Sequence, residues 1–248
     1  MAQRDEVVRY ADELLEIERF PEYGTPGLQV IGADEVTKIA CGVSASLELI
    51  ERAAAAGAQL LIVHHGLFWR NEPVWIDRRQ RGRLRALFEA DLSLAAYHLA
   101  LDAHPLIGNN AVLANAMRVD VERTFAEVGV GGCLREPWNI DGVVACIREA
   151  VGGREPLVFP HGPERVQRVA ICSGAAGRGL IRAAHEGYDL YVTGEPEEPS
   201  LQTARELGIH FVAAGHDATE RLGVQALAER LAGVFSLEWE FIPVANPV

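Results

Sequence analysis

Short apolar runs alternate with segments of helical periodicity along this chain of 248 residues. An order of strand, helix and strand that repeats in this way favours parallel βαβ units, in which each helix packs on the sheet formed by its flanking strands. We predict strands at residues 28–31, 37–43, 92–97, 166–172, 189–193, 209–214 and 235–241, and in the run from Leu60 to Val63. We predict helices at residues 5–19, 46–56, 78–90, 109–118, 140–151, 177–186, 198–207 and 218–231. The predicted fold class is therefore α/β with mostly parallel sheets.

An internal repeat supports this interpretation. Segments of the first half match segments of the second: residues 36–40 match 166–170 and 52–60 match 182–190 at a shift of 130, and 94–98 match 212–216 at a shift of 118. Short alanine-rich matches also arise by chance. Two copies of a unit made of three strands and two helices explain all three matches together, so we predict two repeat-related domains.

Two adjacent histidines, His64 and His65, follow the apolar run that begins at Leu60, and Gly66 comes next. In an open α/β sheet, ligands bind at the carboxyl ends of the strands. Adjacent side chains on a regular strand point to opposite faces, so the two imidazoles converge only where the strand loses its regularity, and Gly66 lets the chain turn there. Neutral imidazoles are the commonest transition-metal ligands. The alternative is a histidine pair on an exposed loop that binds no ligand.

Two further predicted strand ends carry comparable side chains. His98 and Asp102 follow one strand, and His216 and Glu220 follow another. At the shift of 118, His98 falls on His216 and Asp102 falls on Glu220, so the repeat predicts equivalent places for both pairs. Each carboxylate has an alternative: Asp102 can start a turn, and Glu220 can close a capping box in which Asp217 is the N-cap.

Histidines and carboxylates gathered from three strand ends suit two divalent ions about 3.5 to 4 Å apart, with a carboxylate and a water between them. The histidine-rich set favours Zn, Fe, Co, Ni or Mn over Mg or Ca. Such a pair of ions lowers the pKa of the bridging water and leaves open positions for an oxyanion or a carbonyl group. We therefore predict two divalent transition-metal ions per chain.

Composition disfavours several other classes of protein. The 35 acidic residues exceed the 23 Lys and Arg, giving a formal charge of -12, so binding of nucleic acid is not expected. The arginines at residues 78–85 are interpreted as the solvated face of a helix. The four cysteines form no C-x-x-C pair, which excludes a zinc knuckle and a thioredoxin motif. No secretory leader and no run of roughly 20 apolar residues is present, so we expect a cytoplasmic protein that does not bind membranes.

Four segments are similar to the signatures of a known family, and together they make the resemblance specific. They are Val63-His64-His65-Gly66, Tyr97-His98-Leu99-Ala100-Leu101-Asp102, Gly108-Asn109-Asn110-Ala111 and Gly215-His216-Asp217-Ala218-Thr219-Glu220-Arg221-Leu222-Gly223. The chain resembles the Nif3-like dinuclear-metal hexameric proteins, also called type 2 GTP cyclohydrolase I. The resemblance extends from Gly27 to the C-terminal strand, which is nearly the whole chain.

This resemblance implies the Nif3-like fold of two interleaved α/β domains. We expect the first domain to comprise residues 1–125 and about 216–248, and the second to comprise residues 126–215, with the metal site between them. The resemblance also implies a homohexamer in the form of a toroid, with the metal sites facing its interior.

The resemblance assigns site residues by motif position. The implied metal ligands are His64, His65, Asp102, His216 and Glu220. His98 is expected near the ions, beyond bonding distance, as a group that contacts a ligand or the substrate, and His98 and Glu220 are the expected catalytic groups. Glu195 lies in a segment that resembles part of the family's cavity wall, although residues 196–199 depart from the usual pattern.

The family label implies hydrolytic opening of the imidazole ring of GTP with release of formate. The chain has no G-x-x-x-x-G-K-[ST] loop for a triphosphate. We therefore expect a metal-dependent hydrolase that acts on a nucleotide or a related small molecule. The alternative is a non-catalytic, metal-binding hexameric ring that acts through protein partners. A screen of hydrolysable substrates with metal-loaded protein distinguishes the two.

Overall fold

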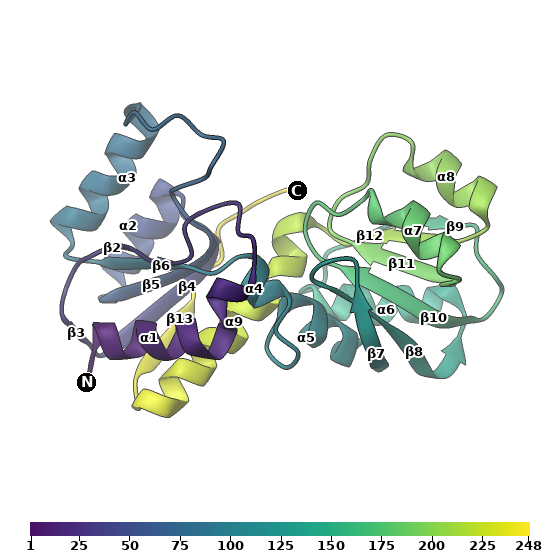
Figure 1. Ribbon diagram of the computed structural model, residues 1–248, viewed down its shortest axis with the longest axis horizontal. Coiled ribbons are helices and arrows are strands. Elements are labelled where there is room, and N and C mark those ends of the chain that lie inside the picture. Colours follow the sequence, from purple (N-terminus) through teal and green to yellow (C-terminus); the bar gives the residue numbers. More distant parts are fainter. The chain divides into compact units, whose positions relative to one another are not determined.

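The computed structural model describes residues 1–248, and its contacts divide the chain into two compact units (Figure 1). The first unit comprises Met1–Leu101 and Val224–Ala245, and the second comprises Asp102–Gly223 and Asn246–Val248. The chain leaves the first unit and later returns to it, so the two units are interleaved in sequence. Residues 102–125 and 216–223 belong to the second unit, whereas the sequence-based division placed them in the first.

The first unit contains a five-stranded sheet in the order β13-β4-β5-β6-β2. The strands are β2 (Gly27–Val30), β4 (Lys38–Ser44), β5 (Leu60–His65), β6 (Ser93–Ala96) and β13 (Glu238–Phe241). All neighbouring strands are parallel except β2, which runs antiparallel to β6. Two short strands, β1 (Ala2–Gln3) and β3 (Glu35–Val36), pair separately. The first five residues of β5 are buried, which explains why that strand is continuously apolar up to His64.

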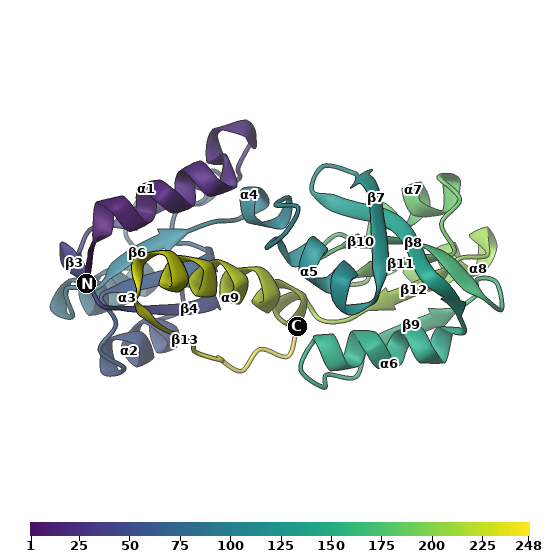
Figure 2. The same cartoon turned by 90° about the horizontal axis from the view of Figure 1, so that it is seen from below.

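Helices cover both faces of this sheet. They are α1 (Arg4–Leu15), α2 (Leu47–Ala55), α3 (Arg78–Glu89) and the last part of α9 (His216–Phe235), with a 3-10 turn η1 (Ile17–Arg19) and the short α4 (Leu99–Asp102). α2 and α3 pack on one face through Leu49, Ile50 and Leu87. Figures 1 and 2 show α1 and the C-terminal part of α9 on the opposite face, where Tyr10 and Phe235 meet edge to face. No helix of the structure combines the length and the apolar character that crossing a bilayer requires.

The second unit contains a six-stranded sheet in the order β7-β8-β10-β11-β12-β9. The strands are β7 (Val119–Phe125), β8 (Gly129–Trp138), β9 (Leu157–Pro160), β10 (Val166–Cys172), β11 (Leu190–Thr193) and β12 (His210–Ala213). β10, β11 and β12 are parallel, and antiparallel strands flank them on both sides. The helices α5 (Asn109–Ala116) and α6 (Ile140–Ala150) belong to one core cluster, and α7 (Gly179–His185) and α8 (Ser200–Leu207) belong to another.

The predicted repeat is present in both sheets. The order β4-α2-β5-α3-β6 in the first unit matches β10-α7-β11-α8-β12 in the second, and in each unit the three strands are parallel neighbours. The α/β fold class with mostly parallel sheets is therefore confirmed.

The third strands of the two repeats align one residue away from the match found in the sequence. β6 pairs with β5 in the first unit, and β12 pairs with β11 in the second. In these two pairings Ala96 of β6 and Ala213 of β12 occupy equivalent positions. The shift that relates these strands is therefore one residue smaller than 118. His98 corresponds to Gly215, not to His216, so their predicted equivalence is wrong by one residue.

Five strands were not predicted: the short β1 and β3 in the first unit, and β7, β8 and β9 in the second. Between residues 119 and 125 only Val119 and Phe125 are buried, so β7 shows no alternation of apolar and polar residues. β8 contains Gly129, Gly131 and Gly132, and glycine lowers strand propensity. A side chain at Gly131 or Gly132 would overlap the Tyr188 hydroxyl or the backbone of residue 120, so close packing requires these glycines. Residues 102–125 belong to the second unit because β7 pairs with β8 in its sheet and α5 packs in its core.

Candidate functional site

His64 and His65 lie at the carboxyl end of β5 in the first unit. The pairing of β5 with β6 ends at Val63, whereas the pairing with β4 continues to His65, which lies opposite Ser44. The two imidazole centroids are 4.9 Å apart, so the adjacent rings converge as the sequence predicted. Loss of one neighbouring strand at this point allows that convergence, because the backbone is no longer held on both sides.

His98 joins this pair. It follows β6, and its ring centroid is 4.9 Å from that of His64 and 5.5 Å from that of His65. Each of the three residues offers one ring nitrogen, and these three nitrogens all lie within 4.8 Å of one another. We call His64, His65 and His98 the three-histidine cluster. His98 is thus closer to the other two rings than the sequence led us to expect.

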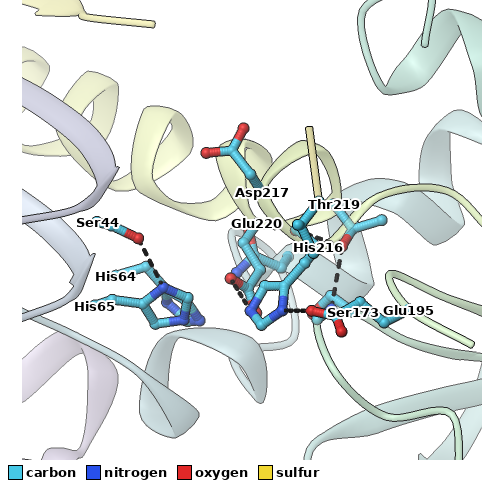
Figure 3. Close-up of polar contacts among 12 residues, drawn as sticks. Ser44, His64, His65, Ser173, Glu195, His216, Asp217, Thr219 and Glu220 are labelled. Atoms are coloured by element: carbon cyan, nitrogen blue, oxygen red, sulfur yellow. Dashed lines mark hydrogen bonds and ion pairs between the residues drawn. The ribbon is translucent and has the colours of Figure 1, made fainter. Parts of the chain in front are cut away.

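Each ring of the three-histidine cluster has a partner at Nδ1. His64 Nδ1 is 2.8 Å from the carbonyl oxygen of Tyr97, and His65 Nδ1 is 3.1 Å from the hydroxyl of Ser44 (Figure 3). His98 Nδ1 is 3.4 Å from Oε2 of Glu22. A carbonyl can only accept a hydrogen bond, so Nδ1 of His64 carries the proton and its lone pair is on Nε2. A proton held at Nδ1 by such a partner is the usual arrangement of a metal-binding histidine.

Gln29 supports the loop that follows the two histidines. Its Oε1 accepts a hydrogen bond from the backbone nitrogen of Leu67 at 2.7 Å, and its Nε2 donates to the carbonyl oxygen of Thr25 at 2.6 Å. A β-carbon at Gly66 would lie 2.4 Å from the amide of Gln29 and 2.7 Å from Cβ of Ala96. The role of Gly66 is therefore close approach, and its φ is not positive.

His216 is the first residue of α9, in the second unit, and lies between two carboxylates. Its Nε2 is 3.1 Å from Oε2 of Glu220, and its Nδ1 donates to Oε1 of Glu195, which follows β11 (Figure 3). Burial favours the neutral ring, but the contacts with Glu220 and Glu195 outweigh it and raise the pKa of His216 to about 9. We call Glu195, His216 and Glu220 the carboxylate–histidine cluster.

Asp102 is buried and held by neutral donors of the second unit. Asn109 Nδ2 donates to its Oδ1 at 2.8 Å, and the Ser173 hydroxyl donates to the same oxygen at 3.2 Å. Asn110 accepts from the backbone nitrogen of Ser173 at 2.7 Å and donates to the carbonyl oxygen of Asp102 at 3.2 Å. Neutral donors orient a carboxylate without cancelling its charge, so Asp102 retains the capacity to bind a cation.

Glu220 is not part of a capping box. α9 begins at His216, so Asp217 lies inside the helix, and its carboxylate accepts a hydrogen bond from Arg221 at 2.6 Å. Glu220 is 3% exposed, and Gly174 packs so closely against it that a β-carbon there would lie 2.2 Å from its Oε1. The alternative interpretation of Glu220 as an N3 residue is therefore wrong.

Sequence reasoning missed the side chains that orient these groups. Ser173 and Gly174 directly follow β10, so the strand-end rule applied to that strand would have found them. Asn109 and Asn110 are fully buried at the start of α5, and adjacent asparagines after a glycine were a visible signal. Glu22 gave no signal, because it lies in a turn-rich passage far from His98 in sequence.

The two clusters suit divalent transition metals. The three-histidine cluster offers imidazole nitrogens, and the carboxylate–histidine cluster offers carboxylate oxygens and one imidazole, a set that favours Zn, Fe, Co, Ni or Mn over Mg or Ca. The partners at Nδ1 in the three-histidine cluster and the donors that orient the Asp102 carboxylate are the supporting contacts that such ligands require.

A family model described as "Duf34/NIF3 (NGG1p interacting factor 3)" matches residues 2–247. The chain belongs to this family. Curated relatives from Pseudomonas aeruginosa and Escherichia coli K12 are both 42% identical, over 247 and 244 residues, and cover 97% and 98% of each chain. Both carry the name "GTP cyclohydrolase 1 type 2 homolog".

Solved structures agree with the family assignment. A structure described as "protein ybgI, unknown function" superimposes with a TM-score of 0.95 at 40% identity and covers 100% of both chains. TTHA1606 from Thermus thermophilus gives a TM-score of 0.91 at 37% identity, again over 100% of both chains. HcgD from Methanocaldococcus jannaschii, at 23% identity and a TM-score of 0.85 over 98% of both chains, supports the fold alone.

Proposed function

We propose that this protein binds two divalent transition-metal ions and is a metal-dependent hydrolase of the GTP cyclohydrolase I type 2 kind. The proposed ligands are His64, His65, Asp102, His216 and Glu220, and the proposed substrate is a nucleotide or a related small molecule. The observation that carries the proposal is the convergence of the imidazoles at the end of β5, each with a partner at Nδ1. The name of the curated relatives supports the reaction class.

The proposed reaction consumes two water molecules. The first adds to C8 of the guanine ring and breaks the bond from C8 to N9, and the second releases C8 from N7 as formate. Both ring nitrogens gain protons. Bound divalent ions supply Lewis acidity at such a centre. His98 and Glu220 are the proposed groups that accept protons from water and return them to nitrogen.

Metal content is the first test. Protein purified without chelator is expected to hold roughly two transition-metal ions per chain by elemental analysis. The variants His65→Gln and His216→Gln each alter one cluster. If the clusters supply one dinuclear centre, either variant lowers the content of both ions, whereas independent sites each lose only their own ion. No metal in purified protein and no uptake on reconstitution would contradict the proposal.

Substrate binding is the second test. The formal charge of -12 opposes binding of a nucleotide, so the metals and local arginines must reverse the field at the site. We expect metal-loaded protein to bind GTP and release formate, and metal-free protein to do neither. Equal GTP affinity in both forms, or none in either, would count against the cyclohydrolase activity. Glu220→Gln tests the ligand directly, because it keeps the shape and removes the charge, and is expected to lower metal content.

The alternative is a non-catalytic, metal-binding homohexameric ring that acts through protein partners. Val74, Trp75 and Ile76 support an interaction role, since these adjacent apolar residues are 103%, 67% and 64% exposed between β5 and α3. Light scattering is expected to give six times the chain mass of 27.0 kDa. A metal-free ring that keeps its mass, and metal-loaded protein inactive toward every nucleotide tested, would favour this function over the hydrolase.

We also propose a cytoplasmic location, which the four free cysteines support, because such thiols persist in reducing compartments. Cell fractionation tests it, and recovery from an oxidising compartment would contradict it.

A further inference from the structure

Glu22 places a buried carboxylate against the three-histidine cluster. The residue is 4% exposed and precedes β2 in the first unit. Its Oε1 accepts a hydrogen bond from the backbone nitrogen of Ala100 at 2.9 Å, which fixes the side chain. Its Oε2 lies 3.4 Å from Nδ1 of His98, and neither of these two buried atoms has a hydrogen-bond partner, so each is the polar atom that the other faces.

This contact determines which nitrogen of His98 carries the proton. A buried carboxylate oxygen that lacks a donor destabilises the folded protein, and more so when it is charged. If Nδ1 of His98 carried the lone pair, two electron-rich atoms would face each other in a buried setting. The neutral ring therefore carries its proton on Nδ1, directed at Glu22, and its lone pair on Nε2.

The other two rings of the cluster have the same arrangement. Nδ1 of His64 faces the Tyr97 carbonyl and Nδ1 of His65 faces the Ser44 hydroxyl, so all three rings are held at the same atom. Trp69 packs edge to face against His98 with the centroids 5.2 Å apart and restricts its rotation.

We infer that Glu22 is a positioning residue that fixes His98 as a third imidazole ligand for an ion bound by His64 and His65. Its carboxylate holds the proton at Nδ1 and so presents Nε2 to the ion. The inference rests on the proposed metal binding and refines it: His98 becomes a ligand instead of a group that moves protons, because a ring with Nε2 on the ion and a proton on Nδ1 has no free lone pair, and Glu22 orients it. Glu22 itself does not contact the ion.

Glu22→Gln tests the carboxylate. Glutamine has one acceptor oxygen, so it can satisfy either the Ala100 amide or the His98 proton, but not both. If the glutamine oxygen accepts the hydrogen bond from Ala100, the glutamine NH₂ group donates to Nδ1 of His98. The ring proton of His98 then moves to Nε2, so Nε2 no longer has a lone pair for the ion. Removing a partner of this kind weakens metal binding by about 10 to 100-fold.

The experiment is a titration of metal-free protein with Co²⁺, followed by its visible absorption. Glu22→Gln and His98→Gln are each expected to weaken binding by about 10 to 100-fold and to change the Co²⁺ spectrum. The double variant is expected to match His98→Gln alone, since Glu22 acts only through His98. Wild-type affinity and spectrum in either single variant, or additive losses in the double variant, would overturn the inference.

Ser93→Ala is the matched control for stability. The buried Ser93 hydroxyl accepts a hydrogen bond from the backbone nitrogen of Gly32 at 3.0 Å, at the other end of β6, so the variant loses a comparable acceptor without touching a histidine. Wild-type Co²⁺ binding is expected, and a loss equal to that of Glu22→Gln would refute the positioning role. If Glu22→Gln does not fold, Glu22→Asp replaces it, because it keeps the charge and withdraws the carboxylate. No Co²⁺ uptake by the wild-type protein would instead refute the proposed metal binding itself.

Discussion

Gly174 offers the sharpest test of how the second unit holds Glu220. Its φ is +67°, in the left-handed region, and its backbone nitrogen donates to the Thr219 hydroxyl at 3.1 Å. In Gly174→Ala, the new Cβ would lie 2.2 Å from Oε1 of Glu220. Apolar contacts require about 3.5 Å, so the carboxylate must move by about 1 Å. The substitution therefore displaces a proposed ligand without removing it.

Two costs contribute to the expected loss of stability. A left-handed conformation costs an L-residue about 1 to 2 kcal/mol, and an added methyl in a packed site costs about 1 to 3 kcal/mol. Gly174→Ala is therefore expected to lower the free energy of unfolding by about 2 to 5 kcal/mol. Gly208→Ala separates the costs, because φ there is +65° and the nearest atom to its Cβ is 4.0 Å away. That control is expected to lose only about 1 to 2 kcal/mol.

Urea unfolding followed by circular dichroism measures both variants, with stabilities from linear extrapolation. Elemental analysis of the same samples measures retained metal. We expect Gly174→Ala to lose more stability than Gly208→Ala and to lose metal, while Gly208→Ala keeps wild-type metal content. Equal stability and equal metal content in the two variants would refute the argument that Gly174 is required by its contact with Glu220.

Three further outcomes are expected. Asn109→Ala removes one donor from Asp102, which keeps Ser173, and removes the acceptor that lies 2.6 Å from the Gly223 nitrogen, so urea unfolding should show a loss of about 1 to 3 kcal/mol, and a loss within error would contradict its clamping role. Cys41 should not react with iodoacetamide in native protein at pH 8, because burial and then the charge of Glu240 raise its pKa to about 12. Peptide mass spectrometry measures the labelling, and labelled Cys41 in native protein would refute this prediction. Gly233→Ala in α9 should stabilise the protein by about 0.5 to 1 kcal/mol, since its Cβ meets no atom within 4 Å; a lowered unfolding midpoint would show that space alone does not decide the effect.

The sequence predicted the strands that carry buried residues on both faces. β4, β5, β10 and β11 read as apolar runs because helices cover each side of the sheet. The predicted range of β10 equals the observed one, and the ends of the other three differ by no more than two residues. β7 is an edge strand of its sheet and β8 lies next to it, and both obey other constraints. Val121 is 49% exposed within β7, and the glycines of β8 are set by tertiary contacts that sequence periodicity does not contain.

The boundary of the first helix shows a similar limit. The pattern of apolar residues predicted a helix to residue 19, with Pro21 ending it, but α1 ends at Leu15. Glu16 adopts a left-handed conformation, with φ of 49°, and its backbone nitrogen bonds to residues 12 and 13. A non-glycine residue in this conformation is uncommon, so no local sequence rule would have placed the end of the helix there.

The candidate ligands were predictable for a reason that does not extend to their supports. A strand end is a local feature, so His64, His98 and His216 could be located from the apolar runs before them. The groups that orient them come from other elements. In the first unit, the Glu22 carboxylate, which precedes β2, faces Nδ1 of His98. In the second unit, the Glu195 carboxylate, which follows β11, accepts a hydrogen bond from Nδ1 of His216. The one-residue offset between the repeats explains this difference, because histidines that leave their sheets at non-equivalent positions cannot be oriented by equivalent partners. An imidazole therefore follows the third strand of each repeat, and a different contact fixes it in each unit.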